Sequence, residues 1–313
     1  MIVDLPDTTV SKIARSLVKV REEGGAVALG RVLTLVIATT HGLEEEAIEA
    51  ANDASREHPM RVLVVIDQGP GEAKLDAQIR VGGDAGASEV VVLRATGDAA
   101  GNQESLVTGL LLPDAPVVAW WPDFPPARPA SDPIGKIAQR RITDASTKPY
   151  ENGRLNKLGA TYAPGDTDLA WTRLTHWREQ LAAVLDQPPY EPVTAVEVVG
   201  ASSSPSTGLL AAWLRLKLDV PVLWRYAPEE EWTHGIQKVR LTRASGDITL
   251  ERSNDIDATL TQPGQPAHDI VLPRRTLREC LAEELRRLDP DVLYGRVVGE
   301  GWKLLGPHQT PSS

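Results

Sequence analysis

The chain reads twice as strand, helix and strand, followed each time by two further strands, and this order leaves few folds open. The strand–helix–strand segments are predicted at residues 31–38, 44–57 and 61–67 and again at residues 194–199, 205–218 and 222–226. Apolar β-branched runs predict the strands, and apolar residues at helical spacing predict the helices. Because two strands joined through a helix usually lie parallel in one sheet, we expect an α/β fold.

Each predicted parallel pair is followed by two strands that a turn containing glycine and aspartate joins. These strands are predicted at residues 77–81 and 89–94 and at residues 238–243 and 248–252. The β-α-β-β-β pattern therefore predicts two domains, each a mixed β-sheet flanked by helices, with a helical C-terminus. The two halves share negligible sequence identity. An internal duplication is thus a hypothesis that different strand orders in the two sheets would contradict.

A segment rich in proline, alanine and charge separates the two patterns. We expect an N-terminal α/β domain at residues 1–125, a linker or interdomain segment at 126–166, a C-terminal α/β domain at 167–306 and a disordered tail at 307–313. Within the middle segment, residues 132–147 are predicted to hold a helix that carries Arg140 and Arg141.

Charge and cysteine content exclude several function classes. The chain has 33 lysines and arginines against 43 acidic residues, whereas a nucleic-acid-binding domain is usually basic. The single cysteine, Cys280, cannot form an internal disulfide or a multi-cysteine metal site. No apolar run approaches the ~20 residues of a membrane span, and the N-terminal residues lack a secretion signal. We expect a cytoplasmic protein that binds neither nucleic acid nor membranes.

The most apolar run of the chain, residues 110–122, contains the adjacent pair Trp120 and Trp121. Neighbouring side chains of an extended strand point to opposite faces of the sheet. One indole is therefore expected to fill a core, and the other to need a second surface such as another domain, a ligand or a partner.

Further candidates for a partner interface lie in the middle segment and at the start of the helix that follows it. Tryptophan and arginine often dominate the binding energy of an interface. Acidic residues also favour a helix start for electrostatic reasons alone, so both interpretations stay open. The candidate interface residues are Trp120, Trp121, Arg140, Arg141, Asp166, Asp168, Trp171 and Arg173.

Two segments are candidates for an anion site, and each also has a purely structural interpretation. The serines at 202–204 follow a strand and open a helix, where N–H groups and hydroxyls can hold a phosphate or simply cap the helix. The basic residues at 56–61 follow a helix, where positive charge also complements the helix dipole. The candidate anion-site residues are Arg56, His58, Arg61, Ser202, Ser203 and Ser204.

The sequence shows no recognisable catalytic motif. It lacks the Gly-Lys-Ser/Thr ending of a nucleotide P-loop, the GxSxG nucleophile elbow and HExxH. Residues 82–89 resemble a glycine-rich loop superficially, but their spacing is not GxGxxG, and a turn with positive φ is the simpler interpretation. Cys280 lies beside an apolar helical stripe, as a buried inert thiol does. We expect no catalytic residue, no cofactor and no metal.

Seven blocks of sequence, taken together and in order, are similar to one family. They lie at residues 24–36, 54–62, 81–90, 111–122, 139–144, 165–175 and 187–193. In these blocks the chain resembles the OpcA family of glucose-6-phosphate dehydrogenase assembly proteins. The resemblance implies a protein that binds glucose-6-phosphate dehydrogenase and promotes its active oligomer, supporting NADPH supply by the oxidative pentose phosphate pathway. It implies no catalytic residues.

The chain differs from the family in its cysteine content, and the sequence also leaves one alternative function open. In cyanobacterial relatives cysteines are linked to redox control, but Cys280 alone cannot form an intramolecular disulfide, which argues against a thiol switch here. The alternative is a sugar-phosphate- or nucleotide-binding α/β protein or enzyme that uses the serine-rich loop at 200–208. The oligomeric state of the chain itself stays open.

Overall fold

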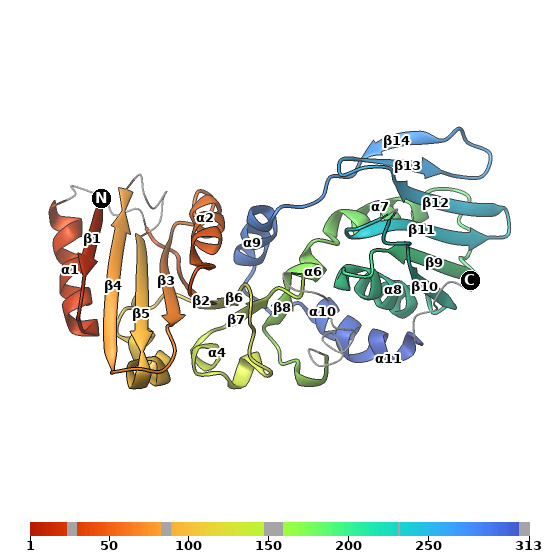
Figure 1. The fold of residues 1–313 in the computed structure, drawn as a ribbon. Coiled ribbons are helices and arrows are strands. Elements are labelled where there is room, and N and C mark those ends of the chain that lie inside the picture. The colour runs from red at the N-terminus through yellow and green to blue at the C-terminus, as the bar shows by residue number, and fades with distance from the viewer. Residues whose placement is uncertain (24–29, 83–88, 147–158, 231, 307–313) are drawn as a thin grey trace. The chain divides into compact units, whose positions relative to one another are not determined.

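The computed structural model describes residues 1–23, 30–82, 89–146, 159–230 and 232–306. The chain forms two compact units, each with its own sheet (Figure 1). Unit 1 comprises Met1–Asp144, Ala163–Thr167 and Leu277–Pro290, and unit 2 comprises Ala145–Tyr162, Asp168–Thr276 and Asp291–Ser313. The mixed α/β architecture with two sheets confirms the predicted fold class.

Unit 1 is built on an eight-stranded sheet in the order β1-β4-β5-β3-β2-β6-β7-β8. Its elements are β1 (Ile2–Leu5), α1 (Val10–Glu23), β2 (Leu33–Thr40), α2 (Glu44–Ala54), β3 (Met60–Asp67), β4 (Lys74–Val81), β5 (Glu89–Thr96), η2 (Gly97–Asn102), α3 (Gln103–Thr108), β6 (Val117–Trp121), η3 (Pro129–Ser131), α4 (Pro133–Ile137), β7 (Arg140–Thr143), β8 (Asp166–Asp168) and α9 (Leu277–Arg286). Strands β5, β3, β2, β6 and β7 run parallel. A parallel sheet of this kind is normally covered on both faces, which accounts for its nearly continuous apolar strands.

Both faces of the unit 1 sheet are covered. Helices α1, α3 and α4 share one buried cluster with Trp121. Helix α2 packs on strands β2 and β3 and also against α9. The chain therefore returns after more than a hundred residues of unit 2 to add α9 to unit 1.

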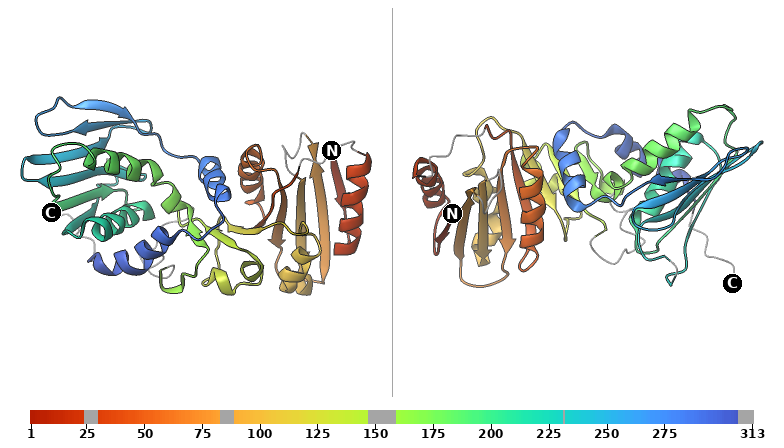
Figure 2. Two further views of the ribbon diagram at one scale, coloured as in Figure 1. Left: turned by 180° about the vertical axis from the view of Figure 1, so that it is seen from behind. Right: turned by 90° about the horizontal axis from the view of Figure 1, so that it is seen from above.

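Unit 2 is built on a six-stranded sheet in the order β10-β9-β11-β12-β13-β14. Its elements are α6 (Leu169–Thr172), α7 (Thr175–Leu185), β9 (Ala195–Gly200), α8 (Pro205–Leu218), β10 (Val222–Tyr226), β11 (Ile236–Arg243), β12 (Gly246–Arg252), β13 (Asp257–Thr261), β14 (His268–Val271), α10 (Val292–Arg296), η4 (Val297–Gly301) and α11 (Trp302–Leu304). The last three form the expected C-terminal helix, which contains a π turn at η4. The helices of unit 2 gather on one face of its sheet (Figure 2).

The two sheets order their strands differently. In unit 1, the strands that follow the first β-α-β pair extend the sheet beyond its second strand, β3. In unit 2, the corresponding strand β11 pairs with the first strand, β9. This is the outcome that contradicts an internal duplication, although the β-α-β-β-β order is present in both units.

The boundaries of the compact units differ from the division expected from the sequence. Residues 126–144 contribute α4 and β7 to unit 1 and are not a linker, because β7 pairs with β6. Helix α4 ends at Ile137, so Arg140 and Arg141 lie on a strand and not on the expected helix. Residues 277–290 belong to unit 1 and not to a C-terminal domain. The expected disordered tail at 307–313 lies outside the described residues.

The outer face of the unit 2 sheet carries a charge cluster on three neighbouring strands. Glu197 on β9 accepts hydrogen bonds from Arg225 Nε on β10, at 2.9 Å, and from Arg240 on β11. Burial alone would raise the pKa of Glu197, but the bonds from Arg225 and Arg240 outweigh it and lower the pKa below 4.5. A carboxylate with a lowered pKa stabilises the folded state above its unfolded-state pKa and loses that contribution as the pH falls through its folded-state pKa.

We expect Glu197→Gln to lower the free energy of unfolding at pH 7 by about 1 kcal/mol, because its arginine partners are partly exposed. The difference between variant and parent should shrink as the pH falls from 4.5 toward 3, where the parent carboxylate becomes protonated. Denaturant unfolding of parent and variant at pH 7 and at pH 3 measures this difference in the free energy of unfolding. A constant difference would show that Glu197 acts through packing and not through charge.

Candidate functional site

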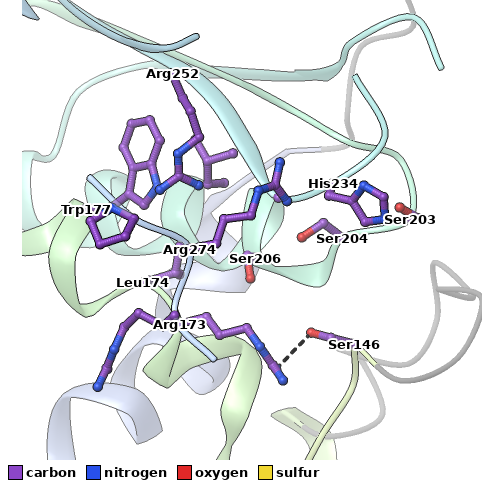
Figure 3. A pocket seen from close by; sticks show the side chains of 14 residues that line it. Ser146, Arg173, Leu174, Trp177, Ser203, Ser204, Ser206, His234, Arg252 and Arg274 are labelled. Atoms are coloured by element: carbon purple, nitrogen blue, oxygen red, sulfur yellow. Dashed lines mark hydrogen bonds between the residues drawn. The ribbon is translucent and has the colours of Figure 1, made fainter. Parts of the chain in front are cut away.

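A pocket of about 430 Å³ lies in unit 2 where strand β9 gives way to helix α8 (Figure 3). In open sheets this edge, outside the carboxyl ends of parallel strands, is where ligands commonly bind. The pocket is lined by Ser146, Arg173, Leu174, Trp177, Ser203, Ser204, Ser206, His234, Gly235, Ile236, Arg252, Pro273, Arg274 and Arg275.

The serine-rich segment forms one wall of this pocket. Gly200 ends β9 in a tight crossing, since a Cβ there would lie 2.4 Å from Thr207 Oγ1. The Ser203 hydroxyl donates to the Thr233 carbonyl at 3.0 Å, and Ser206 donates to the Ala170 carbonyl at 3.0 Å. Ser204 occupies the N-cap of α8 but makes no side-chain capping bond. Its hydroxyl therefore remains available at the pocket, next to the positive end of a helix of 14 residues.

Four arginines from three segments of the chain also line the pocket. Arg173 follows α6 and donates to Ser146 Oγ at 3.3 Å. Arg252 ends β12 and donates to the Leu272 carbonyl, with its guanidinium 5.3 Å from the Trp177 ring. Arg274 pairs with Asp255 and lies 5.4 Å from the Trp232 ring. Arg275 donates to the Thr172 carbonyl at 2.9 Å.

The pocket is lined by positive charge, whereas the chain as a whole is negatively charged. Its lining residues include four arginines and no carboxylate, although the whole chain has a formal net charge of −10. Burial lowers the pKa of Arg252 to about 10, and the positive charge of Arg274 lowers it as well, whereas Asp255 raises it. Arg252 still carries its charge at neutral pH, in a position where water solvates it poorly.

Unit 1 has a crevice at its own topological switch point, between β2 and β6. Strands β3 and β5 extend the parallel sheet to one side of β2, and β6 and β7 extend it to the other. A pocket of about 180 Å³ lies at the carboxyl ends of β2, β3 and β6. This is the position at which doubly wound folds hold a dinucleotide.

The residues of the unit 1 crevice do not fit a pyrophosphate. Asp67, Asp123 and Asp132 line it, and Asp123 Oδ2 accepts a hydrogen bond of 2.7 Å from the Thr40 hydroxyl. Helix α2 begins with three glutamates, and the first, Glu44, accepts the Gly42 N–H at 2.6 Å. Carboxylates therefore occupy the region where a dinucleotide-binding turn offers glycine N–H groups to phosphate.

Both tryptophans of the adjacent pair are buried, so neither offers an exposed contact surface, although Trp121 lines the unit 1 crevice. Trp120 is fully buried and Trp121 is 4% exposed. The two indoles do point to opposite faces of β6, as strand geometry requires. Neither is exposed because unit 1 covers its sheet on both faces.

Most of the other interface candidates also have internal partners. Arg140 pairs with Glu284, and Arg141 pairs with Asp166, all four being buried. Asp168 caps α6 and accepts the Ala145 N–H. These side chains hold strands and helices together and do not form an accessible contact surface.

Trp171 and Arg173 differ in exposure, although they are neighbours in sequence. Trp171 is 1% exposed, and its Nε1–H donates to Asp291 Oδ2 at 2.8 Å. Arg173 is partly exposed and lines the unit 2 pocket. Two of the eight interface candidates thus line a cavity, Arg173 in the unit 2 pocket and Trp121 in the unit 1 crevice.

The candidate anion-site residues divide between the two units. Arg56 is exposed beside Asp53, and Arg61 is buried against Glu89 at 2.9 Å. Neither these two nor His58 line the unit 2 pocket, whereas Ser203 and Ser204 do. Ser202 is exposed next to them. The cations that accompany the serine wall are Arg173, Arg252, Arg274 and Arg275, and no local sequence pattern connects these arginines with the serines.

Two other features predicted from the sequence are the glycine-rich turn at 82–89 and the buried thiol of Cys280. Of the glycine-rich stretch at 82–89, Gly82 has a φ of +75°, as in the expected turn, and residues 83–88 lie outside the described residues. Cys280 is buried on α9. Among the residues that the structure describes, no group of histidine, cysteine and acidic side chains has the arrangement of a metal site.

The chain matches two family models, and these matches identify the family to which it belongs. Residues 51–160 match the family model described as the glucose-6-phosphate dehydrogenase subunit N-terminal domain, and residues 164–298 match the corresponding C-terminal domain. Together the matches cover more than three quarters of the chain. The chain belongs to the OpcA family of glucose-6-phosphate dehydrogenase assembly proteins. The pentose phosphate pathway and NADPH are the metabolic context of this family.

Individual known proteins are at most distantly similar to this OpcA-family chain. No curated protein matches it. A glucose-6-phosphate 1-dehydrogenase structure from Mycobacterium avium is 11% identical, over 90% of this chain and 93% of that one, with a TM-score of 0.46. An oxidoreductase from Sinorhizobium meliloti is 11% identical, over 85% and 86%, with a TM-score of 0.44. Scores below 0.5 assign neither a fold nor an activity.

None of the described helices of this OpcA-family chain combines the length and the apolar character that crossing a bilayer requires.

Proposed function

We propose that this chain binds glucose-6-phosphate dehydrogenase in the cytoplasm and promotes the active oligomer of that enzyme, without catalytic activity of its own. The observation that carries the proposal is the match of both family models, which together span the two sequence halves. The acidic unit 1 crevice supports a non-catalytic role, since its carboxylates repel the pyrophosphate of a dinucleotide cofactor.

The proposed activation is a shift between two states of the enzyme. A binding protein changes such an equilibrium only by its difference in affinity for the two states. A tenfold rise in the ratio of active to inactive enzyme needs a difference of about 1.4 kcal/mol. The buried tryptophans and ion pairs of this chain are expected to contribute by maintaining its fold, while exposed surface makes the contact.

The test combines association with activity. The chain and the dehydrogenase from the same organism are mixed at micromolar concentrations, and the mass of the complex is measured by light scattering after size-exclusion chromatography. We expect a complex that contains both proteins, a larger enzyme oligomer and a saturable rise in NADPH production as the chain is added.

Two controls separate the parts of this proposal. The heat-denatured chain at equal concentration should not activate the enzyme. The native chain alone, with glucose 6-phosphate and NADP, should produce no NADPH. Absence of both a complex and activation would refute the assembly role, and turnover proportional to the concentration of the isolated chain would refute the non-catalytic role.

A further inference from the structure

The unit 2 pocket contains a buried positive charge that lacks a carboxylate of its own. Arg252 is 6% exposed. Its Nε makes no hydrogen bond with any described residue, and its Nη2 donates to the Leu272 carbonyl. The carboxylate that acts electrostatically on Arg252 is that of Asp255. Asp255 pairs directly with Arg274, and its side chain is 77% exposed. A buried charge is unfavourable unless it is paired, and Arg252, unlike the equally buried Arg243, borders a pocket with room for an anionic partner.

Several independent groups surround the same space. Arg274 extends into the pocket between Arg252 and the serine wall (Figure 3). The Ser204 hydroxyl and the N-terminus of α8 face it from the opposite wall. A tetrahedral phosphate suits this set, since guanidinium groups bind its oxygens in pairs and a helix N-terminus stabilises its charge.

The pocket is larger than one phosphate group and partly apolar. Leu174, Trp177 and Ile236 line it beside the arginines. A volume of about 430 Å³ lies in the range of small-molecule sites. The apolar wall gives contact area to a carbon skeleton attached to the phosphate, and a bare inorganic ion would leave this wall without a partner.

We propose that the unit 2 pocket binds a small phosphorylated metabolite, with its phosphate held by Arg252, Arg274 and the start of α8 and its carbon body against Trp177. This site is a property of the chain alone and does not depend on the proposed enzyme partner. The proposed site includes the serine loop that the sequence predicted for an anion site. Its cations are arginines of unit 2 and not the predicted Arg56, His58 and Arg61.

Titration calorimetry on the full chain tests the proposal with inorganic phosphate, glucose 6-phosphate, glucose and citrate as probes. We expect glucose 6-phosphate to bind at one site per chain at least fivefold more tightly than inorganic phosphate. Glucose should not bind, and citrate should bind more weakly than the phosphate ester. At a concentration one hundred times the dissociation constant, the ester should raise the melting temperature by about 5 °C.

Matched substitutions locate the site. Arg252→Met should raise the dissociation constant for glucose 6-phosphate at least tenfold, and Arg274→Gln at least threefold. Arg243→Met is the control, because Arg243 is equally buried in the same sheet, has an unbonded Nε among the described residues and donates to the Pro189 carbonyl outside the pocket. It should change the dissociation constant less than twofold.

Three results would overturn the proposal. One is the absence of saturable binding of the phosphate ester to the folded parent chain. Another is binding that Arg252→Met and Arg274→Gln leave unchanged while circular dichroism shows that both variants are folded. The third is citrate or inorganic phosphate binding as tightly as the ester. Where Arg252→Met does not fold, Arg274→Gln decides alone, because the Arg274 side chain is 28% exposed.

Discussion

Glu284→Gln is expected to lower the free energy of unfolding of unit 1 by about 3–5 kcal/mol, the range found when one member of a buried ion pair is removed. Glu284 lies on α9 and accepts hydrogen bonds from Nε and Nη2 of Arg140 on β7. Arg140 also donates to the Asp289 carbonyl at 2.9 Å. Both side chains are almost fully buried, so the substitution leaves Arg140 charged and without its counter-charge. Denaturant unfolding measures the change.

The chain offers a matched control for this pair. Glu57, just after α2, pairs with Arg286 on α9 at 2.9 Å, but both side chains are more than half exposed. Glu57→Gln should therefore cost less than 1 kcal/mol. Replacing Arg140 and Glu284 together by methionine should recover most of the loss, because no buried charge remains. Equal effects of Glu284→Gln and Glu57→Gln would contradict this account of the buried pair.

Trp171→Ala is expected to destabilise unit 2 by about 3–5 kcal/mol, since it removes a large side chain from a close-packed core. The Trp171 ring lies 6.0 Å from the Tyr294 ring, and the Arg178 guanidinium lies 3.8 Å above it. Its Nε1–H reaches Asp291 at the start of α10. The indole thus connects α6 to the C-terminal helix within unit 2. Thermal and denaturant unfolding of the variant measure the loss.

A pair of phenylalanine variants separates packing from hydrogen bonding. Trp171→Phe keeps most of the apolar contact but loses the bond to Asp291, at a cost of about 1–2 kcal/mol, because the lost bond goes to a charged but only partly buried acceptor. In Trp213 the Nε1 has no hydrogen-bond partner among the described residues, so Trp213→Phe should cost less. If Trp171→Ala weakened binding of the dehydrogenase while leaving unfolding unchanged, Trp171 would be a contact residue and not a core residue.

Local sequence patterns predicted the strands and helices whose partners lie close by in the chain. Strands β2 and β3 correspond to the predicted apolar runs at 31–38 and 61–67, and α2 corresponds to the helix between them. These three elements are neighbours in the chain and also contact one another, since β2 pairs with β3 and α2 packs on both strands. Strand β7 was missed because Arg140 and Arg141 look like exposed residues. Their neutralising acids, Glu284 and Asp166, are distant in sequence, and a local pattern does not reveal such pairs.

The candidate site was predicted in part for the same reason. The serine segment follows a strand and begins a helix, and both features are local. Arg252 could have been placed by alternation, since Ile248, Leu250 and Arg252 share the inward face of β12. Arg274 and Arg275 come from a segment without periodicity. Only the three-dimensional fold shows that they lie beside the serines.

The placement of α9 has a consequence for the order in which the protein is made. A ribosome releases the chain from its N-terminus, so β1 to β7 emerge long before residues 277–290. Until then Arg140 has no counter-charge and α2 has no α9 to pack against. The strands of unit 1 up to β7 are thus synthesised first, but unit 1 reaches its final stability only after the strands of unit 2 have also been made.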